Sequence, residues 1–281
     1  MTRYFVYDVF SDKPFGGNQL AVIPDAMDLP EADLQRIARE FNFSETTFVF
    51  PADDPANHAK VRIFTPTMEV PFAGHPVIGT AIALADSSGG PEEMTLELGV
   101  GPLRCQAAQG KAAFTTAVPL EIMAEPDLEL VVSTLGLQGA DIVTNTHVPT
   151  LATLGLPFTI TELASREALA RIEIDISKMR IGAAAHPASL DFAQFVYWVN
   201  GDEIHARMFA PLDNIPEDPA TGSATATLAA LRAHITGEEQ SFTLHQGEDM
   251  GRHSVIGVRT TNGAITISGA AKRTMEGQLV Y

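Results

Sequence analysis

Short apolar and β-branched runs, broken by turn residues, indicate that strands dominate this chain. In the first half they predict strands at 4–10, 20–23, 44–50 and 60–65, and two or three more between 94 and 118. In the second half they predict strands up to about residue 158, then at 191–199, 204–209, 241–245, 254–260, 264–268 and 277–281. Phe15-Gly16-Gly17-Asn18 supplies the turn of a hairpin between the first two strands.

Helical spacing of apolar residues occurs in fewer segments. Pro30 opens a helix that should stop near Asn42. Further helices are predicted at 74–85, 127–135, 165–172 and 223–234, and the segment 87–91 should break the first of these. The helices at 74–85 and 223–234 are apolar on all sides, so each is predicted to be buried within its own half of the chain.

One motif occurs twice, about 145 residues apart. Arg62-Ile63-Phe64-Thr65-Pro66 leads to Gly74 and the first all-apolar helix, and Arg207-Met208-Phe209-Ala210-Pro211 leads to Gly222 and the second. So long a period fits a duplicated domain rather than a solenoid. We therefore predict an α+β fold of two similar domains, each a sheet or barrel rolled around a central apolar helix. The two helix N-termini would point free N–H groups into a cleft between the domains and hold anions there.

A boundary near residues 118–120 separates an N-terminal domain, 1–118, from a C-terminal domain, 119–268. The last stretch, 269–281, is a candidate for completing the first domain. At 281 residues the chain is long enough for two such domains. Its 45% hydrophobic and 19% charged residues are ordinary for a soluble globular protein.

The charge balance is strongly acidic, with a formal net charge of −17 and a pI near 4.7. Nucleic acid and anionic membrane surfaces are therefore poor partners, because both need clustered Lys and Arg. No window holds the ~18 or more apolar residues of a spanning helix, and the N-terminus reads as a strand and not as a signal peptide. The single cysteine, Cys105, cannot form an internal disulfide, so a cytoplasmic location is expected.

Several common catalytic motifs are missing. There is no Gly-x-Gly-x-x-Gly and no Walker loop, so neither a dinucleotide nor a nucleoside triphosphate is favoured. The eight histidines show no His-Glu-x-x-His and no Cys/His pairing, so no metal site is predicted. Ser223 lacks the second glycine of a nucleophile elbow, which argues against a covalent hydrolase.

Two residues of the first half are candidates for acid–base chemistry. Glu45 lies among four phenylalanines between positions 41 and 50, and a carboxylate in apolar surroundings has a raised pKa that suits it to take and return a proton. His75, between Gly74 and Pro76, stands at a helix N-terminus, where the dipole disfavours the imidazolium. Each also has a plain structural interpretation: Glu45 as a capping-box partner or solvated strand end, and His75 as a helix cap.

The second half offers a similar group. Asp218 and Ser223 lie on either side of the turn into the second apolar helix, where Asp218 could serve only as its cap and Ser223 only as its first residue. The glycines are harder to explain in that way. Gly74 and Gly222 occupy equivalent places in the two copies of the motif, and a missing Cβ lets a ligand approach the backbone closely.

Two further loops are ambiguous on their own. Gln246 and Gly247 begin a tight loop that ends at Arg252 and that could clamp a carboxylate or phosphate, or be an ordinary hairpin loop. Asn18, at the end of the first hairpin turn, is equally open to either interpretation.

Taken together, five segments resemble the PhzF-like phenazine biosynthesis isomerases. They come in the family's order and are Phe15-Gly16-Gly17-Asn18, Ser44-Glu45-Thr46-Thr47-Phe48, Phe72-Ala73-Gly74-His75-Pro76, Glu217-Asp218-Pro219-Ala220-Thr221-Gly222-Ser223-Ala224 and Gln246-Gly247…Met250-Gly251-Arg252. The resemblance implies a diaminopimelate-epimerase-like fold, a homodimer and proton transfer without a cofactor. It assigns the acid/base role to Glu45 and supporting catalytic roles to His75, Asp218 and Ser223.

We therefore predict an isomerase that moves a proton within a small carboxylate-bearing metabolite. The residues predicted to bind this substrate are Asn18, Gly74, Gly222, Gln246 and Gly247. The two helix N-termini would stabilise the negative charge that develops on deprotonation.

Two alternatives stay open. One is an amino-acid epimerase or racemase, but a mechanism with two facing thiols is excluded because the chain has only Cys105. The other is a non-catalytic ligand-binding member of the family. Gln19, Val77 and His253 depart from the family's usual residues, so the phenazine precursor is not assumed to be the substrate.

Overall fold

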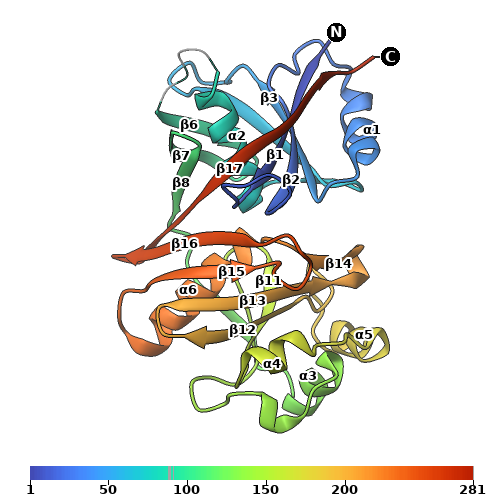
Figure 1. The fold of residues 1–281 in the computed structure, drawn as a ribbon, viewed down its shortest axis with the longest axis vertical. Coiled ribbons are helices and arrows are strands. Elements are labelled where there is room, and N and C mark those ends of the chain that lie inside the picture. Colours follow the sequence, from blue (N-terminus) through green and yellow to red (C-terminus); the bar gives the residue numbers. More distant parts are fainter. Residues whose placement is uncertain (88–89, 91, 281) are drawn as a thin grey trace. The chain divides into compact units, whose positions relative to one another are not determined.

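The computed structural model describes residues 1–87, 90 and 92–280 as a strand-rich α/β chain (Figure 1). The chain divides into two compact units, Met1–Thr116 with Thr266–Tyr281, and Ala117–Ile265. Most of the predicted break at 87–91 lies outside the described residues. Within the described residues, no helix has the length and apolar character needed to cross a membrane.

A closed barrel of eight strands forms the first unit. Its strands are β1 (Arg3–Val9), β2 (Asn18–Ile23), β3 (Glu45–Phe50), β4 (Ala59–Phe64), β6 (Glu93–Leu98), β7 (Gly101–Ala108), β8 (Lys111–Thr116) and β17 (Ala264–Gln278). β17 closes the barrel by pairing with both β8 and β1. The pairs β2–β3 and β4–β6 are parallel. Parallel neighbours need crossover connections, which are supplied by the helices α1 (Glu31–Phe41) and α2 (Gly74–Ala85), the latter reached through β5 (Glu69–Val70).

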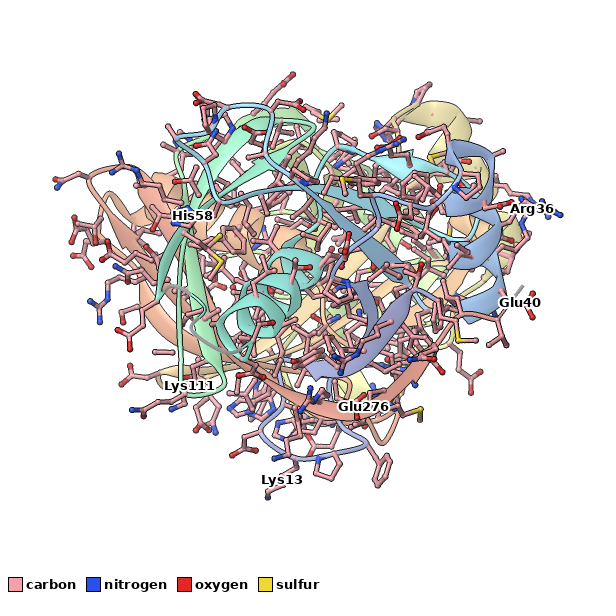
Figure 2. The ribbon with its side chains drawn as sticks, turned by 90° about the horizontal axis from the view of Figure 1, so that it is seen from above. Lys13, Arg36, Glu40, His58, Lys111 and Glu276 are labelled. Carbon is pink, nitrogen blue, oxygen red and sulfur yellow. The ribbon has the colours of Figure 1, made fainter. Side chains whose placement is uncertain are left out.

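Helix α2 packs against several strands of its unit. It contacts β1, β2, β3, β7 and β8, and every residue from Gly74 to Ala83 is buried. A Cβ at Gly79 would meet the side chains of Leu20 and Val9, so this glycine lets the helix approach β1 and β2 closely. In Figure 2 the charged side chains of Arg36 and Glu40, on α1, point away from the barrel instead.

The second unit repeats this order of elements. Its strands are β9 (Glu121–Ala124), β10 (Thr150–Thr153), β11 (Pro157–Glu162), β12 (Gln194–Asn200), β13 (Glu203–Ala210), β14 (Ile215–Asp218), β15 (Ser241–Gln246) and β16 (Ser254–Thr261). Its helices are α3 (Leu128–Leu135), α4 (Arg166–Ala170), α5 (Ile176–Ala185) and α6 (Gly222–Thr236). The parallel pairs β11–β12 and β13–β15 correspond to β2–β3 and β4–β6, and α6 takes the place of α2.

The duplicated arginine makes the same contacts in both units. Arg62 binds Glu69 on β5 at 2.7 Å, and Arg207 binds Glu217 on β14 at 2.8 Å. Each guanidinium also packs over the phenylalanine two residues further on, 5.1 and 4.8 Å from the ring centroid. The motif therefore has a structural role, because it ties the long strand to the short strand that leads into α2 or α6.

We expect Arg207→Gln to lower the free energy of unfolding by about 2–3 kcal/mol. The Arg207 side chain is only 11% exposed, and it also donates to the carbonyl of Leu169 at 3.0 Å, so its loss leaves buried acceptors unpaired. Arg36→Gln is the control, because Arg36 is 78% exposed and its ion pair is the i,i+3 pair with Asp33, and such exposed pairs contribute under about 1 kcal/mol. Urea denaturation of the two variants measures the difference, and equal losses would contradict this role.

Most predicted elements are confirmed, including the end of α1, where Asn42 adopts a left-handed φ of 53°. The structure differs from the prediction at two places. The helix α5 was not predicted, although Asp175 caps it by accepting from the backbone N–H groups of Ser177 and Lys178. In place of separate strands at 264–268 and 277–281, one strand, β17, runs from Ala264 to Gln278, and its C-terminal half, from Ala271 on, pairs with β1; residue 281 lies outside the described residues.

Candidate active site

The predicted residues of the first unit begin three neighbouring elements. Asn18 is the first residue of β2, Glu45 is the first of β3, and His75 is the second of α2. β2 and β3 run parallel, with Leu20 opposite Glu45. Their starts therefore lie at the same edge of the barrel, and the contact between Glu45 and His75 places the start of α2 there too.

His75 connects these side chains. Its Nε2 lies 3.4 Å from Glu45 Oε2, and its Nδ1 lies 3.4 Å from Asn18 Nδ2. The Ser44 hydroxyl donates to Asn18 Oδ1 at 3.2 Å. His75 and Asn18 are 4% and 2% exposed, whereas the Glu45 side chain is 16% exposed. Glu45 is therefore less buried than His75 and Asn18, although its Oε2, which faces His75, is buried.

Burial keeps His75 neutral. The loss of hydration lowers the pKa of His75 to about 3, and a backbone hydrogen bond with Gln19 opposes this only in part. At pH 7 the imidazole therefore carries no charge and does not hold Glu45 in an ion pair. Among the described residues, His75 Nε2 has no hydrogen-bond partner of good geometry, which leaves it open to a ligand.

The start of α2 is not capped by a side chain. The N-cap residue before the helix is Ala73, which has no side chain able to cap the first turn, and His75 is the second helical residue. The interpretation of His75 as a helix cap is therefore wrong. Gly74 is the first residue of the helix, as its place in the motif predicted.

In the second unit, a hydrogen-bonded group surrounds Asp218, the last residue of β14. The Thr221 hydroxyl donates to Asp218 Oδ2 at 2.5 Å. Gln246 donates to the Asp218 carbonyl at 2.7 Å and to Thr221 Oγ1 at 2.9 Å, and accepts from the Thr221 backbone N–H at 3.1 Å. Because Gln246 is fully buried and both ends of its amide are used here, its contacts hold the turn before α6 in place.

Gly222 and Ser223 are the first two residues of α6, the places that Gly74 and His75 take in α2. The residue before the helix is Thr221, and its side chain makes no capping hydrogen bond to the first turn. The helix begins at Gly222, so the interpretation of Ser223 as the first helical residue is wrong. Ser223 is half-buried, and its carbonyl accepts from Thr227 Oγ1 at 3.0 Å.

Gly247 is required by the close packing of two loops. Its φ is 74°, and a Cβ there would lie 2.5 Å from the carbonyl oxygen of Arg252 and 2.8 Å from that of Pro219. The glycine thus lets the loop from 247 to 252 lie against the turn that carries Asp218. This contact gives Gly247 a structural role beside its predicted role in binding.

We expect Gly247→Ala to lower the free energy of unfolding by about 2–3 kcal/mol more than Gly251→Ala does. Both glycines have a left-handed φ, 74° and 72°, so both variants carry the same backbone strain of about 1 kcal/mol. Gly251 has open space where its Cβ would lie, so the difference isolates the clash with the two carbonyls. Thermal or urea unfolding measures it, and equal losses would show that the two loops can move apart.

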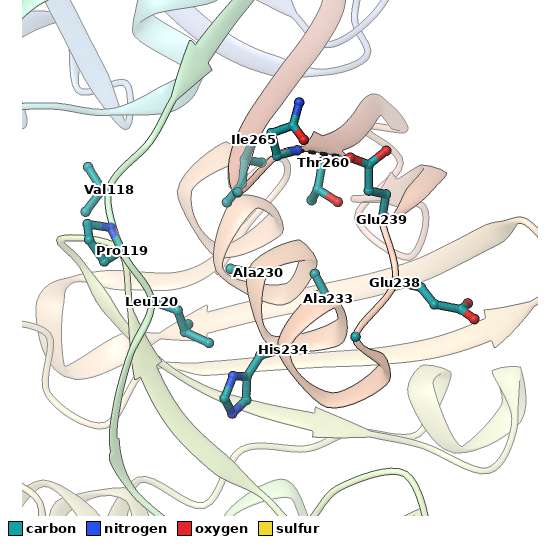
Figure 3. Close-up of a pocket in the computed structure, with 13 residues that line it drawn as sticks. Val118, Pro119, Leu120, Ala230, Ala233, His234, Glu238, Glu239, Thr260 and Ile265 are labelled. Atoms are coloured by element: carbon teal, nitrogen blue, oxygen red, sulfur yellow. Dashed lines mark hydrogen bonds between the residues drawn. The ribbon is translucent and has the colours of Figure 1, made fainter.

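The pocket shown in Figure 3 lies elsewhere in the second unit. It has a volume of about 370 Å³ at the C-terminal end of α6, and its walls include Leu120, Ala230 and Ile265. None of the predicted site residues lines it. Its carboxylates, Glu238 and Glu239, are exposed, so neither is a sheltered base.

Comparison with known proteins identifies the chain's family. The family model described as phenazine biosynthesis-like protein matches residues 7–277, nearly the whole chain. The chain belongs to this PhzF-like family. It is 36% identical to an uncharacterized isomerase of Mesorhizobium japonicum, over 99% of this chain and 98% of that protein. It is 34% identical to the trans-2,3-dihydro-3-hydroxyanthranilate isomerase of Pseudomonas aeruginosa, over 99% of both chains. The protein is accordingly an isomerase.

Solved structures of PhzF-like proteins show the same fold. The crystal structure of a Bacillus anthracis phenazine biosynthesis protein of the PhzF family has a TM-score of 0.87 at 22% identity, covering 100% of this chain and 99% of that one. A predicted epimerase of Pseudomonas aeruginosa has a TM-score of 0.83 at 31% identity, covering 100% of both chains.

Two residues that hold candidate site residues in place were not predicted from the sequence. Ser44 and Thr221 hold Asn18 and Asp218 by hydrogen bonds, and both hydroxyls lie inside segments that carry the family resemblance. A hydroxyl residue next to a candidate polar residue was the available signal. Of the departures from the family, Val77 is fully buried in α2, and His253 stacks on His245 with ring centroids 5.1 Å apart.

Proposed function

We propose that this isomerase moves a proton within a small carboxylate-bearing metabolite, with Glu45 as its general acid and base and without a cofactor. The observation that carries the proposal is a neutral, buried His75 whose Nε2 lies 3.4 Å from Oε2 of Glu45, a residue whose side chain is 16% exposed. A base near a neutral hydrogen-bonding group, at the edge of a rigid barrel, suits repeated proton transfer.

In the proposed reaction, Glu45 removes a proton from one carbon of the substrate. The C–H bond breaks, an O–H bond forms on the carboxyl group, and the electron pair moves into the adjacent π system. Glu45 then returns the proton to another carbon, so the double bond migrates and the carboxylate is regenerated. No electron is gained or lost, so the step needs no oxidant or reductant.

His75 supports both directions of this transfer. Because it is neutral, it does not hold Glu45 as the carboxylate, so Glu45 can carry the proton between the two carbons. Its free Nε2 can hydrogen-bond the substrate, while Asn18 and Ser44 fix the orientation of the ring.

The family resemblance also supports a role for the residues around Asp218 in the second unit. We propose that the start of α6, with the Gly222 N–H and the Ser223 hydroxyl, binds the anionic part of the same substrate. Asp218, held by Thr221 and Gln246, would assist proton transfer. We also propose that the protein is a homodimer and that it is cytoplasmic. Light scattering during size-exclusion chromatography tests whether the protein is a dimer.

An epimerase without thiols is the second candidate, favoured by the 31% identical predicted epimerase. Thiol chemistry is a poor explanation, because Cys105 is buried and burial raises the pKa of its thiol to about 12. An epimerase would return the proton to the same carbon on the opposite face, and so needs a second base besides Glu45.

Proton exchange in D₂O separates these candidates. The enzyme is incubated with trans-2,3-dihydro-3-hydroxyanthranilate, the compound in the names of several relatives, and with other unsaturated or amino carboxylic acids. Deuterium at a new carbon together with a shifted double bond supports the isomerase. Deuterium at the α-carbon with inverted configuration supports the epimerase. No exchange into any of these acids would contradict both.

A further inference from the structure

The loop between β1 and β2 carries an exposed phenylalanine, Phe15, whose backbone conformation is unfavourable for a bulky residue. Phe15 has a φ of 69°, in the left-handed region, and the residue is 71% exposed. Bulky residues rarely adopt this conformation, which glycine and asparagine adopt readily. Among the described residues, no ring contact involving Phe15 occurs.

Phe10, at the other end of the same loop, shows how such strain is normally offset. Its φ is 64°, but the residue is fully buried, and Gly269 leaves room for its ring. Burial of a phenylalanine ring contributes more than the backbone strain costs. Phe15 has the same strain without this compensation, so the folded chain by itself gives no reason for a phenylalanine at position 15.

The loop is tied to the end of β1 and leads directly to Asn18. The backbone N–H of Phe15 donates at 2.6 Å to the carboxylate of Asp8, which is 3% exposed. Gly17 has a φ of 62°, and a Cβ there would collide with the carbonyl of Val9, so the chain is packed tightly before Asn18 begins β2. Since three residues span at most about 11 Å, the Phe15 backbone lies close to Asn18, which contacts His75.

We propose that Phe15 is a substrate-contacting residue, whose ring covers the carbon skeleton of the substrate while Glu45 and His75 act on it. The inference rests on the proposed function, and it explains why an exposed aromatic side chain is kept where the backbone favours asparagine. Closing the ring over the substrate removes apolar surface of both from water and excludes water from the proton being transferred. Phe15 contributes to binding and not to the chemical step.

Phe15→Asn tests this, because it removes the ring and gives the backbone a residue suited to its φ. We expect a melting temperature equal to or above that of the wild type, and a KM raised by about tenfold or more with kcat within about threefold. Phe15→Tyr, which keeps the ring, should restore a KM close to the wild-type value. Met27→Ala, at another exposed apolar residue, is the control and should change neither constant.

The outcomes separate this proposal from the function on which it rests. Exchange in the wild type that is lost in Glu45→Gln supports the proposed function, and a wild-type KM in Phe15→Asn would then overturn the role of Phe15 alone. Unchanged kinetics with a change in oligomeric state would overturn it as well, because the ring would then serve an interface. Absence of exchange in the wild type would remove the proposed function and this inference with it.

Discussion

Replacing Glu45 by Gln should lower the rate of substrate proton exchange by about 100- to 10,000-fold, the usual contribution of a general acid–base group. The amide keeps the shape of the carboxylate and can still contact His75 Nε2 at 3.4 Å, but it cannot accept a proton from carbon. The loss should appear in kcat, with substrate affinity nearly unchanged. Deuterium incorporation followed by NMR measures the rate, and a binding titration measures the affinity.

Glu40→Gln provides the matched control, since Glu40 is exposed on α1 and only five positions away. It should leave both rate and affinity unchanged. Were Glu45→Gln to isomerise at the wild-type rate, Glu45 would be structural, and the proton would have to travel through His75 or Asp218. By contrast, His75→Ala and Ser223→Ala should weaken binding and rate together.

Lowering the pH from 6.5 to 5 should reduce the free energy of unfolding of the wild-type protein by about 2 kcal/mol more than it reduces that of His75→Gln. The folded chain holds the pKa of His75 near 3, whereas the unfolded chain has the ordinary value near 6.5. Between these values the unfolded chain binds a proton that the folded chain does not. Stability is therefore lost as the pH falls through this range, at up to about 1.4 kcal/mol per pH unit. Glutamine at position 75 binds no proton and removes this contribution.

Urea denaturation at several pH values gives the two slopes, so a general loss of stability in His75→Gln does not affect the comparison. His234→Gln serves as the control, because His234 is exposed on α6 and its hydration changes little on folding. Parallel curves for the wild type and His75→Gln would show that His75 takes up its proton in the folded state without cost.

The sequence predicted best those elements whose local pattern agrees with their tertiary role. α2 and α6 are apolar on every face, and the chain buries most of both. The strand β17 was misread because Gly269-Ala270-Ala271-Lys272-Arg273 shows no alternation of apolar and polar residues. This stretch is a strand because Val9 and its neighbours on β1 pair with it, a contact between opposite ends of the chain that no local window contains.

In the candidate site, too, local sequence predicted some residues, whereas others depend on contacts between distant parts of the chain. Glu45 and His75 were found because their neighbours in sequence, the phenylalanines and the helix start, already indicate their chemistry. The main cause of the neutral state of His75 is burial, and not the helix dipole from which it was predicted. The positioning role of Gln246 depends on bonds to Asp218 and Thr221, more than 20 positions earlier, and so could not be read from its own loop.

The closure of the barrel by β17 has a consequence for synthesis on the ribosome. The N-terminal strand β1 emerges first, but its partner, Ala264–Gln278, emerges last, after all of Ala117–Ile265. The unit that is made first must therefore wait, with the edges of β1 and β8 unpaired, while the second unit can fold ahead of it. Nascent chains that end before residue 264 should accordingly carry a folded second unit and an open first one, and it is the open barrel that chaperones would need to protect.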